Sequence, residues 1–176
     1  YIANPMAGGN VITGYRREAN GSLTPLAGFP MAVSAGTDRF RLSLGNVPNM
    51  LYAAISQGGD VQRYRIEPDG SLTELELVSG SAARIWKIAF SATTPYAYAT
   101  NVEAGSISIF SVDTGGALTL QGSFTLPNAI VTAGSIRPFD IISHPTLPVM
   151  YVQATAPAGG VNGAVAVLGI DESTGA

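Results

Sequence analysis

The sequence predicts an all-β fold built from four copies of one repeat, and three observations support this prediction. A tyrosine opens each copy, at Tyr1, Tyr52, Tyr98 and Tyr151. Intervals of roughly 50 residues are typical of propeller blades, solenoids and other repeat arrays. Within the copies apolar and polar residues alternate with a period of two, as at residues 61–66 and 106–112, which favours strands over helices. The 21 glycines and 11 prolines are spread at regular intervals, as turn residues are.

Each copy is expected to carry four strands. The first precedes the tyrosine, where three stretches align without gaps, at residues 38–42, 84–88 and 137–141. In these stretches an aromatic residue is followed two positions later by an aliphatic one, so both are expected on one face of the strand. The tyrosine strand comes second.

The third strand is the apolar-alternating run that follows the tyrosine, at residues 12–15, 61–64, 107–110 and 165–168. A glycine turn followed by a leucine strand then closes three of the copies. The turn and the start of this fourth strand lie at residues 20–24, 69–73 and 115–119. Four antiparallel strands in a repeat of roughly 40–50 residues are typical of a β-propeller blade.

The chain is therefore expected to form a single propeller segment over residues 1–176, with blade boundaries near 1–37, 38–83, 84–136 and 137–176. The first copy begins at its second strand, and the last ends at residues 171–176, where its fourth strand should start. We expect about three and a half blades of a seven-bladed propeller, with the rest supplied by chain outside this segment. Uncovered strand edges should make the isolated segment prone to aggregation.

Composition excludes several classes of protein and site. A hydrophobic content of 46% with 12% charged residues excludes a disordered chain. A net charge of −3, with Lys87 as the single lysine, argues against a nucleic-acid partner. The chain has no cysteine and one histidine, so we expect no disulfide, no metal site and no cofactor. No apolar run reaches the length of roughly 18 residues that a membrane span needs.

At Tyr98-Ala99-Thr100-Asn101 and Tyr1-Ile2-Ala3-Asn4 the sequence resembles the tyrosine-x-threonine-asparagine (YVTN) repeat family. The alternating strand and glycine-leucine turn that follow are similar too, so the resemblance covers essentially the whole chain. It extends to the lactonase-like seven-bladed propellers, which include 6-phosphogluconolactonases and carboxymuconate cyclases. The resemblance implies the propeller fold but leaves the activity open.

Two functions remain from the sequence. Lactonase blades often carry Pro-Arg-His on the innermost strand. The matching positions of this chain, residues 39–41, 85–87 and 138–140, have a different sequence in every copy. This difference favours a non-enzymatic binding or scaffold module, secreted or periplasmic, with a small anionic ligand or a protein as partner. The alternative is a lactonase-type hydrolase or cycloisomerase that acts on a sugar or muconate lactone at the mouth of the central channel. No catalytic residue is assigned.

The candidate ligand-binding residues at the channel mouth are Asp38, Arg84 and Arg137, one from each visible inner strand. Arginine's planar guanidinium suits bidentate contacts to a carboxylate or phosphate. The alternative is that these side chains bind carbonyl groups of loops between blades. An anion is expected to contact Arg84 or Arg137 and not the arginines of the outer strands.

Secondary candidates are Arg41, Lys87, Asp140 and His144. Arg41, Lys87 and Asp140 lie at one aligned position of the inner strands, where charges must be paired or must reach channel water. We expect them to form ion pairs between blades. A Ser143–His144–Asp140 triad is disfavoured because adjacent strand residues point to opposite faces, so His144 is expected to belong to a turn.

Overall fold

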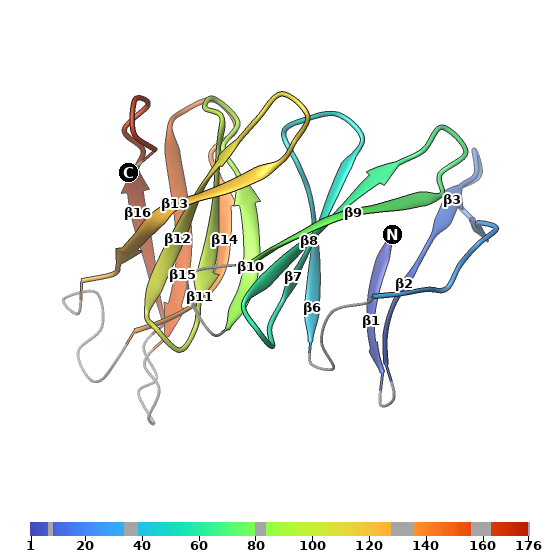
Figure 1. Cartoon of the computed structure of the whole chain (residues 1–176), viewed down its shortest axis with the longest axis horizontal. Coiled ribbons are helices and arrows are strands. Elements are labelled where there is room, and N and C mark those ends of the chain that lie inside the picture. The colour runs from blue at the N-terminus through green and yellow to red at the C-terminus, as the bar shows by residue number, and fades with distance from the viewer. Residues whose placement is uncertain (7–8, 34–38, 80–83, 128–135, 156–162, 176) are drawn as a thin grey trace.

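The computed structural model describes residues 1–6, 9–33, 39–79, 84–127, 136–155 and 163–175. All regular secondary structure in these ranges is β-strand, and the strands form successive sheets side by side in chain order (Figure 1). The all-β, partial-propeller prediction is thereby confirmed. Within the same ranges, no helix has the length and hydropathy needed to cross a membrane.

The second and third repeats each form a complete four-stranded antiparallel blade. Their strands are β6 (Phe40–Leu44), β7 (Met50–Ile55), β8 (Asp60–Ile66) and β9 (Leu72–Ser79), then β10 (Ile85–Phe90), β11 (Tyr96–Asn101), β12 (Ser106–Val112) and β13 (Leu118–Thr125). Each strand pairs with the next in sequence, because short connections of four or five residues join antiparallel neighbours directly. The first strand of each blade, β6 or β10, is the inner strand.

The fourth repeat forms a three-stranded antiparallel sheet in the same order. Its strands are β14 (Arg137–Ser143), β15 (Val149–Thr155) and β16 (Ala164–Gly169). Here β14 is the inner strand and β15 carries the repeat tyrosine, Tyr151.

The first repeat departs from the expected regular strands. Its elements are β1 (Ile2–Met6), β2 (Gly9–Thr13), β3 (Tyr15–Arg17), β4 (Leu23–Pro25) and β5 (Met31–Ala32). The alternating run breaks at Gly14, so β2 pairs with β5 while β3 pairs with β4. Pro25 and Pro30 lie in the stretch that would be the fourth strand, and proline cannot donate a ladder hydrogen bond. The fourth strand is therefore replaced by two short pieces.

The hydrophobic cores lie between neighbouring blades. Between the second and third blades, Tyr52 and Ala54 pack with Ile85, Ile88 and Phe110, all of them buried. Similar clusters join the first blade to the second and the third blade to the fourth. Burying one such isoleucine contributes about 1.5–3 kcal/mol, so the stacking of faces holds the repeats together.

A hydrogen bond from the repeat tyrosine to the next blade recurs at each contact between blades. The hydroxyl of Tyr1 donates to the carbonyl of Gly70 (2.8 Å), that of Tyr52 to Gly116 (2.6 Å) and that of Tyr98 to Gly175 (2.8 Å). We call this contact the tyrosine–turn hydrogen bond. Its acceptors share a left-handed backbone, with φ of 85°, 82° and 74°, which glycine adopts without strain.

Candidate functional site

Two β-bulges shape the inner strands. In β10 the pairing register shifts between Ile85 and Ile88, so that Trp86 and Lys87 together face Thr100 of β11. In β14 a similar shift lies between Pro138 and Asp140. A bulge bends its strand and redirects the side chains there. The expected alternation of an aromatic and an aliphatic residue on one face is therefore wrong for these two strands.

Thr100, the threonine of the tyrosine-x-threonine-asparagine stretch, sits in the bulge of β10. Its buried hydroxyl accepts a hydrogen bond from the backbone N–H of Lys87 at 3.1 Å. The neighbouring Asn101 donates to the hydroxyls of Ser106 and Ser108 on β12, at 3.0 and 2.9 Å. The two residues thus satisfy polar groups that the bulge and the sheet interior would leave unpaired.

The bulges bring aromatic side chains of two blades together. The rings of Trp86 and Phe139 meet edge to face, with centroids 5.5 Å apart and an interplanar angle of 85°. Phe40, the aligned residue of β6, is instead buried in the core because β6 pairs with β7 in regular register. The aligned aromatic residues therefore have different environments.

Arginines of the second blade stack on the tryptophan of the third. The guanidinium carbon of Arg41 lies 4.5 Å from the centroid of the Trp86 ring, and that of Arg39 lies 5.9 Å from it. Such cation–π contacts are worth about 0.5–2 kcal/mol, more when desolvated. They hold two positive charges beside the tryptophan.

An ion pair links the third blade to the fourth. Lys87 Nζ lies 2.5 Å from Asp140 Oδ1, and that same oxygen accepts the backbone N–H of Ile141 at 2.8 Å. Both side chains are partly exposed, so the pair adds at most about 1 kcal/mol to stability. It remains open to a ligand or to water. We call Arg39, Arg41, Trp86, Lys87, Phe139 and Asp140 the inner-strand cluster.

A hollow of about 510 Å³ adjoins this cluster, and its lining comes from three strands and their flanks. The lining residues are Tyr1, Ile2, Ala3, Arg39, Phe40, Arg41, Leu42 and Lys87. Three of them are cations and none is a carboxylate. Lys87 is paired with Asp140, so the two arginines give the hollow the excess positive charge that attracts anions. It is widely open to solvent, so a ligand has access to it.

The predicted ring of charges at the channel mouth is only partly described. Asp38 lies outside the described residues. Arg84 forms an ion pair with Glu103 at 3.3 Å, and both side chains are substantially exposed. Arg137 opens β14, is exposed and stands opposite Thr155 in the register. An anion site made by Arg84 and Arg137 therefore stays a prediction.

His144 lies in the turn between β14 and β15. Its Nδ1 accepts hydrogen bonds from the backbone N–H groups of Thr146 (3.2 Å) and Leu147 (3.1 Å). Asp140 pairs with Lys87. These contacts fit a turn-capping histidine and offer no triad.

Sequence reasoning missed Arg39, Trp86 and Phe139 as parts of one site. The signal available was an aromatic residue directly before a charged one in two aligned copies, Trp86-Lys87 and Phe139-Asp140. Such a pair on an inner strand is compatible with a bulge, but the bulge itself is seen only in the pairing register of β10 with β11 and of β14 with β15.

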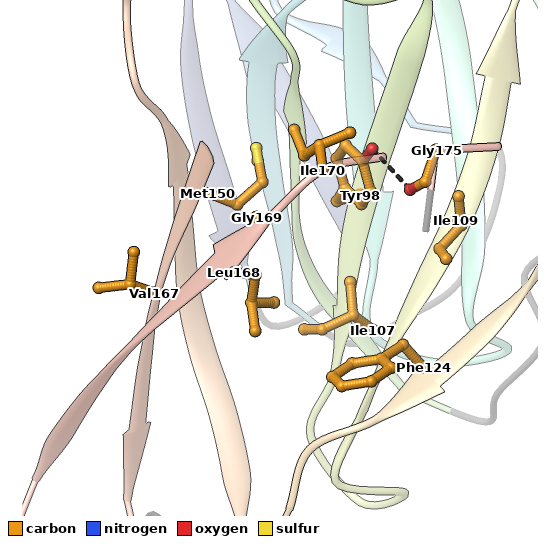
Figure 2. Close-up of a pocket in the computed structure, with 10 residues that line it drawn as sticks. All are labelled: Tyr98, Ile107, Ile109, Phe124, Met150, Val167, Leu168, Gly169, Ile170 and Gly175. Atoms are coloured by element: carbon orange, nitrogen blue, oxygen red, sulfur yellow. Dashed lines mark hydrogen bonds between the residues drawn. The ribbon is translucent and has the colours of Figure 1, made fainter. Parts of the chain in front are cut away.

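A second hollow, of about 230 Å³, lies between the third and fourth blades (Figure 2). Its lining is apolar, with Ile107, Ile109 and Phe124 from the third blade. Tyr98 also lines this hollow, and its hydroxyl donates a hydrogen bond to the carbonyl of Gly175. The lining contains no charged residue, so this hollow offers no group for acid–base chemistry.

Comparison with known proteins gives one family and a set of similar structures. The sequence model of the family described as "Lactonase, 7-bladed beta-propeller" matches residues 4–130. No curated protein sequence matches the chain.

Three solved structures illustrate the similarity. A putative 6-phosphogluconolactonase from Bacteroides fragilis is 26% identical with a TM-score of 0.65, over 89% of this chain and 42% of that one. A putative 6-phosphogluconolactonase from Bacteroides uniformis is 21% identical with a TM-score of 0.70, over 94% and 46%. A periplasmic gluconolactonase from Pseudomonas aeruginosa, PpgL, is 17% identical with a TM-score of 0.70, over 99% and 50%. The chain spans half or less of the length of each of these structures.

Proposed function

Because the chain belongs to the lactonase family of seven-bladed β-propellers, we propose that it binds and hydrolyses a sugar-acid lactone at its inner strands. This is the alternative that the sequence left open, and the family match favours it over a non-enzymatic scaffold. The 26% identical Bacteroides fragilis protein, described as a putative 6-phosphogluconolactonase, suggests a gluconolactone or its 6-phosphate as substrate.

The observation that carries the proposal is the inner-strand cluster beside the cationic hollow. A volume of about 510 Å³ falls within the usual range of small-molecule sites, roughly 300–1,000 Å³. Arg39 and Arg41 would bind the phosphate or carboxylate of the substrate, since a guanidinium binds two oxyanion oxygens at once. The sugar ring would lie beside the edge of Trp86.

The Lys87–Asp140 pair supplies the groups that lactone hydrolysis needs. Water attacks the carbonyl carbon, a C–O bond forms, and the ring C–O bond breaks to give a hydroxy acid. Asp140 would accept the proton of the attacking water and return it to the departing ring oxygen. Lys87 would stabilise the negative charge that develops on the carbonyl oxygen, a contribution of about 10²–10³ in rate for one donor.

We also propose an exported protein, secreted or periplasmic. The similar Pseudomonas gluconolactonase is described as periplasmic, and a chain without cysteine suits any redox environment. Fractionation of the native host with antibodies to the chain tests this. Recovery in the cytoplasmic fraction alone would refute it.

The activity test measures proton release from glucono-δ-lactone and its 6-phosphate in weak buffer, corrected for spontaneous hydrolysis. Asp140→Asn should lower kcat by about 10²-fold or more, as expected for loss of a general base. Arg41→Ala should raise KM for the 6-phosphate more than for the neutral lactone. The matched control is Arg16→Ala on the outer strand β3, where Arg16 is exposed and pairs with Glu18.

Two results would contradict the proposal. The first is hydrolysis by the chain no faster than the spontaneous reaction with either lactone. The second is enzymatic hydrolysis that Asp140→Asn and Lys87→Met leave unchanged.

A further inference from the structure

Thr100 places one hydroxyl beside the backbone of two inner strands. Its side chain is completely buried, and its oxygen accepts the N–H of Lys87 on β10 at 3.1 Å. The same oxygen lies 3.4 Å from the carbonyl oxygen of Lys87 and 3.5 Å from that of Phe139 on β14. A hydroxyl has one proton to donate, so the two carbonyls share it in a three-centre hydrogen bond.

Both strands bulge at the residues that contact this hydroxyl. In β10 the bulge places Trp86 and Lys87 opposite Thr100, and in β14 Phe139 is left out of the pairing with β15. Residues in a bulge lose their regular ladder partners, so backbone groups at both bulges need another partner. Thr100 supplies one to each bulge from a single buried position.

The Lys87–Asp140 ion pair spans the same two bulges. Lys87 is the residue whose N–H and carbonyl contact the hydroxyl of Thr100, and Asp140 directly follows Phe139. The side chains of the pair are 24% and 44% exposed, so water competes for both charges and the pair by itself holds the blades weakly. The backbone that carries the two charges is therefore fixed by other contacts, and the hydroxyl of Thr100 reaches both strands.

The second blade shows the arrangement without this hydroxyl. Ala54 occupies the position aligned with Thr100, two residues after the repeat tyrosine. Arg41 stands opposite Ala54, and β6 pairs with β7 without a shift in register. Over the described strands of the two complete blades, the threonine and the inner-strand bulge occur together in one, and neither occurs in the other. In the fourth blade the aligned residue is Gln153, and the hydroxyl that reaches the bulge of β14 comes from the third blade.

We propose that Thr100 is the positioning residue of the Lys87–Asp140 pair, because its hydroxyl holds the two bulged strands at the separation that lets both charges act on one substrate. Thr100 is buried and has no contact with a substrate, so it acts through the backbone of Lys87 and of Phe139. The catalytic consequence rests on the proposed function. The control of the distance between Lys87 and Asp140 does not.

The first test uses Lys87, the single lysine of the chain, and needs no enzyme activity. Isotopic labelling of lysine nitrogen gives one ammonium signal in magnetic resonance, and its protons exchange with water more slowly while the ammonium donates to a carboxylate. Thr100→Val removes the hydroxyl and should speed this exchange by about 2–5-fold, the range of partly exposed ion pairs. Thr100→Ser keeps the hydroxyl and should restore slow exchange.

Ser43→Ala is the matched control. The hydroxyl of Ser43 on β6 also donates between blades, to the carbonyl of Ile88 on β10 at 2.6 Å, so this variant loses a similar hydrogen bond without touching the pair. Circular dichroism should show the native β-sheet in every variant. Thr100→Ala, which introduces the residue of the second blade, takes the place of Thr100→Val if that variant does not fold.

Two results of this test would overturn the proposal. One is the same exchange rate in the wild type, Thr100→Val and Thr100→Ser. The other is an equal acceleration by Ser43→Ala, which would mean that any lost contact between blades loosens the pair.

The second test measures hydrolysis of the 6-phosphate of glucono-δ-lactone. Thr100→Val should lower kcat by about 10–100-fold, the cost of a misplaced catalytic group, and Thr100→Ser should recover most of it. KM should be nearly unchanged, because Arg39 and Arg41 come from the second blade. In the Lys87→Met background Thr100→Val should cost much less, since residues that act through one another are not additive. A full additive loss would mean that Thr100 does not act through Lys87, which overturns the positioning role.

The two tests separate this inference from the proposed function. A chain that hydrolyses neither lactone refutes the hydrolase, while the exchange rates still decide whether Thr100 positions the pair. A hydrolase whose exchange rates and kcat are both unaffected by loss of the Thr100 hydroxyl refutes the positioning role alone.

Discussion

At the scale of single residues, the hydroxyl of the repeat tyrosine links neighbouring blades. Tyr52 is fully buried and its hydroxyl donates to Gly116 at 2.6 Å. Burial raises the pKa of Tyr52 to about 12, because the phenolate would lose its hydration. The folded protein therefore stabilises the neutral, protonated form of Tyr52.

Removing that hydroxyl should destabilise the protein. We predict that Tyr52→Phe lowers the free energy of unfolding by about 1–2 kcal/mol, because the carbonyl of Gly116 loses its partner. Urea denaturation followed by fluorescence measures the change. Tyr96→Phe is the control: its exposed hydroxyl donates to Ser173 at 3.3 Å, so its loss should cost less than about 0.5 kcal/mol. Equal effects of the two changes would contradict this account.

Thr100 has a similar role within one blade. We predict that Thr100→Val, which keeps the shape and removes the hydroxyl, destabilises the protein by about 1–3 kcal/mol, since the N–H of Lys87 would lose its acceptor. Urea denaturation again gives the change. Thr119→Val, at an exposed position of β13, should have little effect. If Thr100→Val is equally neutral, the hydroxyl does not support the bulge.

At the scale of elements, bulges and glycine turns determine which side chains of a strand face the core and which face the neighbouring blades. The bulge of β10 sends Ile85 and Ile88 into the core while Trp86 meets Arg41 and Phe139. A regular strand has one core face and one opposite face. The bulge therefore lets one inner strand contact both neighbouring blades and also line the cationic hollow beside the inner-strand cluster.

The glycine turns allow a direct comparison of backbone strain with contact between blades. Gly116 and Gly21 have φ of 82° and 86°, so alanine at either position costs about 1–2 kcal/mol of strain. At Gly116 the new Cβ would also press on Tyr52. We predict that Gly116→Ala destabilises the chain by about 1–3 kcal/mol more than Gly21→Ala does.

Thermal and urea unfolding of the two variants measure this difference. Equal destabilisation would mean that the contact between turn and tyrosine adds nothing to stability.

At the scale of the whole molecule, stability depends on faces stacked in order. The three clusters between blades contain the buried tyrosines Tyr52, Tyr64 and Tyr98. Burial raises the pKa of all three phenols above the ordinary value of 10.0. The blades therefore share one sensitivity to alkaline pH.

The sign of that sensitivity follows from linkage. A raised folded pKa means that the folded state holds its proton more tightly, so the contribution is complete below pH 10 and declines above it. For Tyr52 the decline runs from about pH 10 to about 12. We predict that the free energy of unfolding falls over this range, and falls less steeply in Tyr52→Phe. Urea denaturation at pH 8, 10 and 11 tests this, and a pH-independent result would contradict it.

The sequence by itself determined the all-β class, the four repeats and the lactonase-like resemblance. Each depends on local patterns: the period-two alternation at residues 106–112, the recurring tyrosines and the glycine turns at Gly70 and Gly116. Local patterns are preserved in the fold because strand formation and turn geometry depend on residues close together in the chain. The pairing of charges on the inner strands was also expected, and Lys87 with Asp140 is one such pair.

The tertiary structure alone decided which side chains meet. The guanidinium of Arg41 stacks on the ring of Trp86, and Arg84 forms an ion pair with Glu103; no local sequence pattern predicts either contact. The position of a bulge depends on packing against two neighbouring blades and leaves no regular sequence period. The partner of each inner-strand side chain belongs to another repeat, so its identity follows from blade stacking and strand register, which local sequence patterns do not contain.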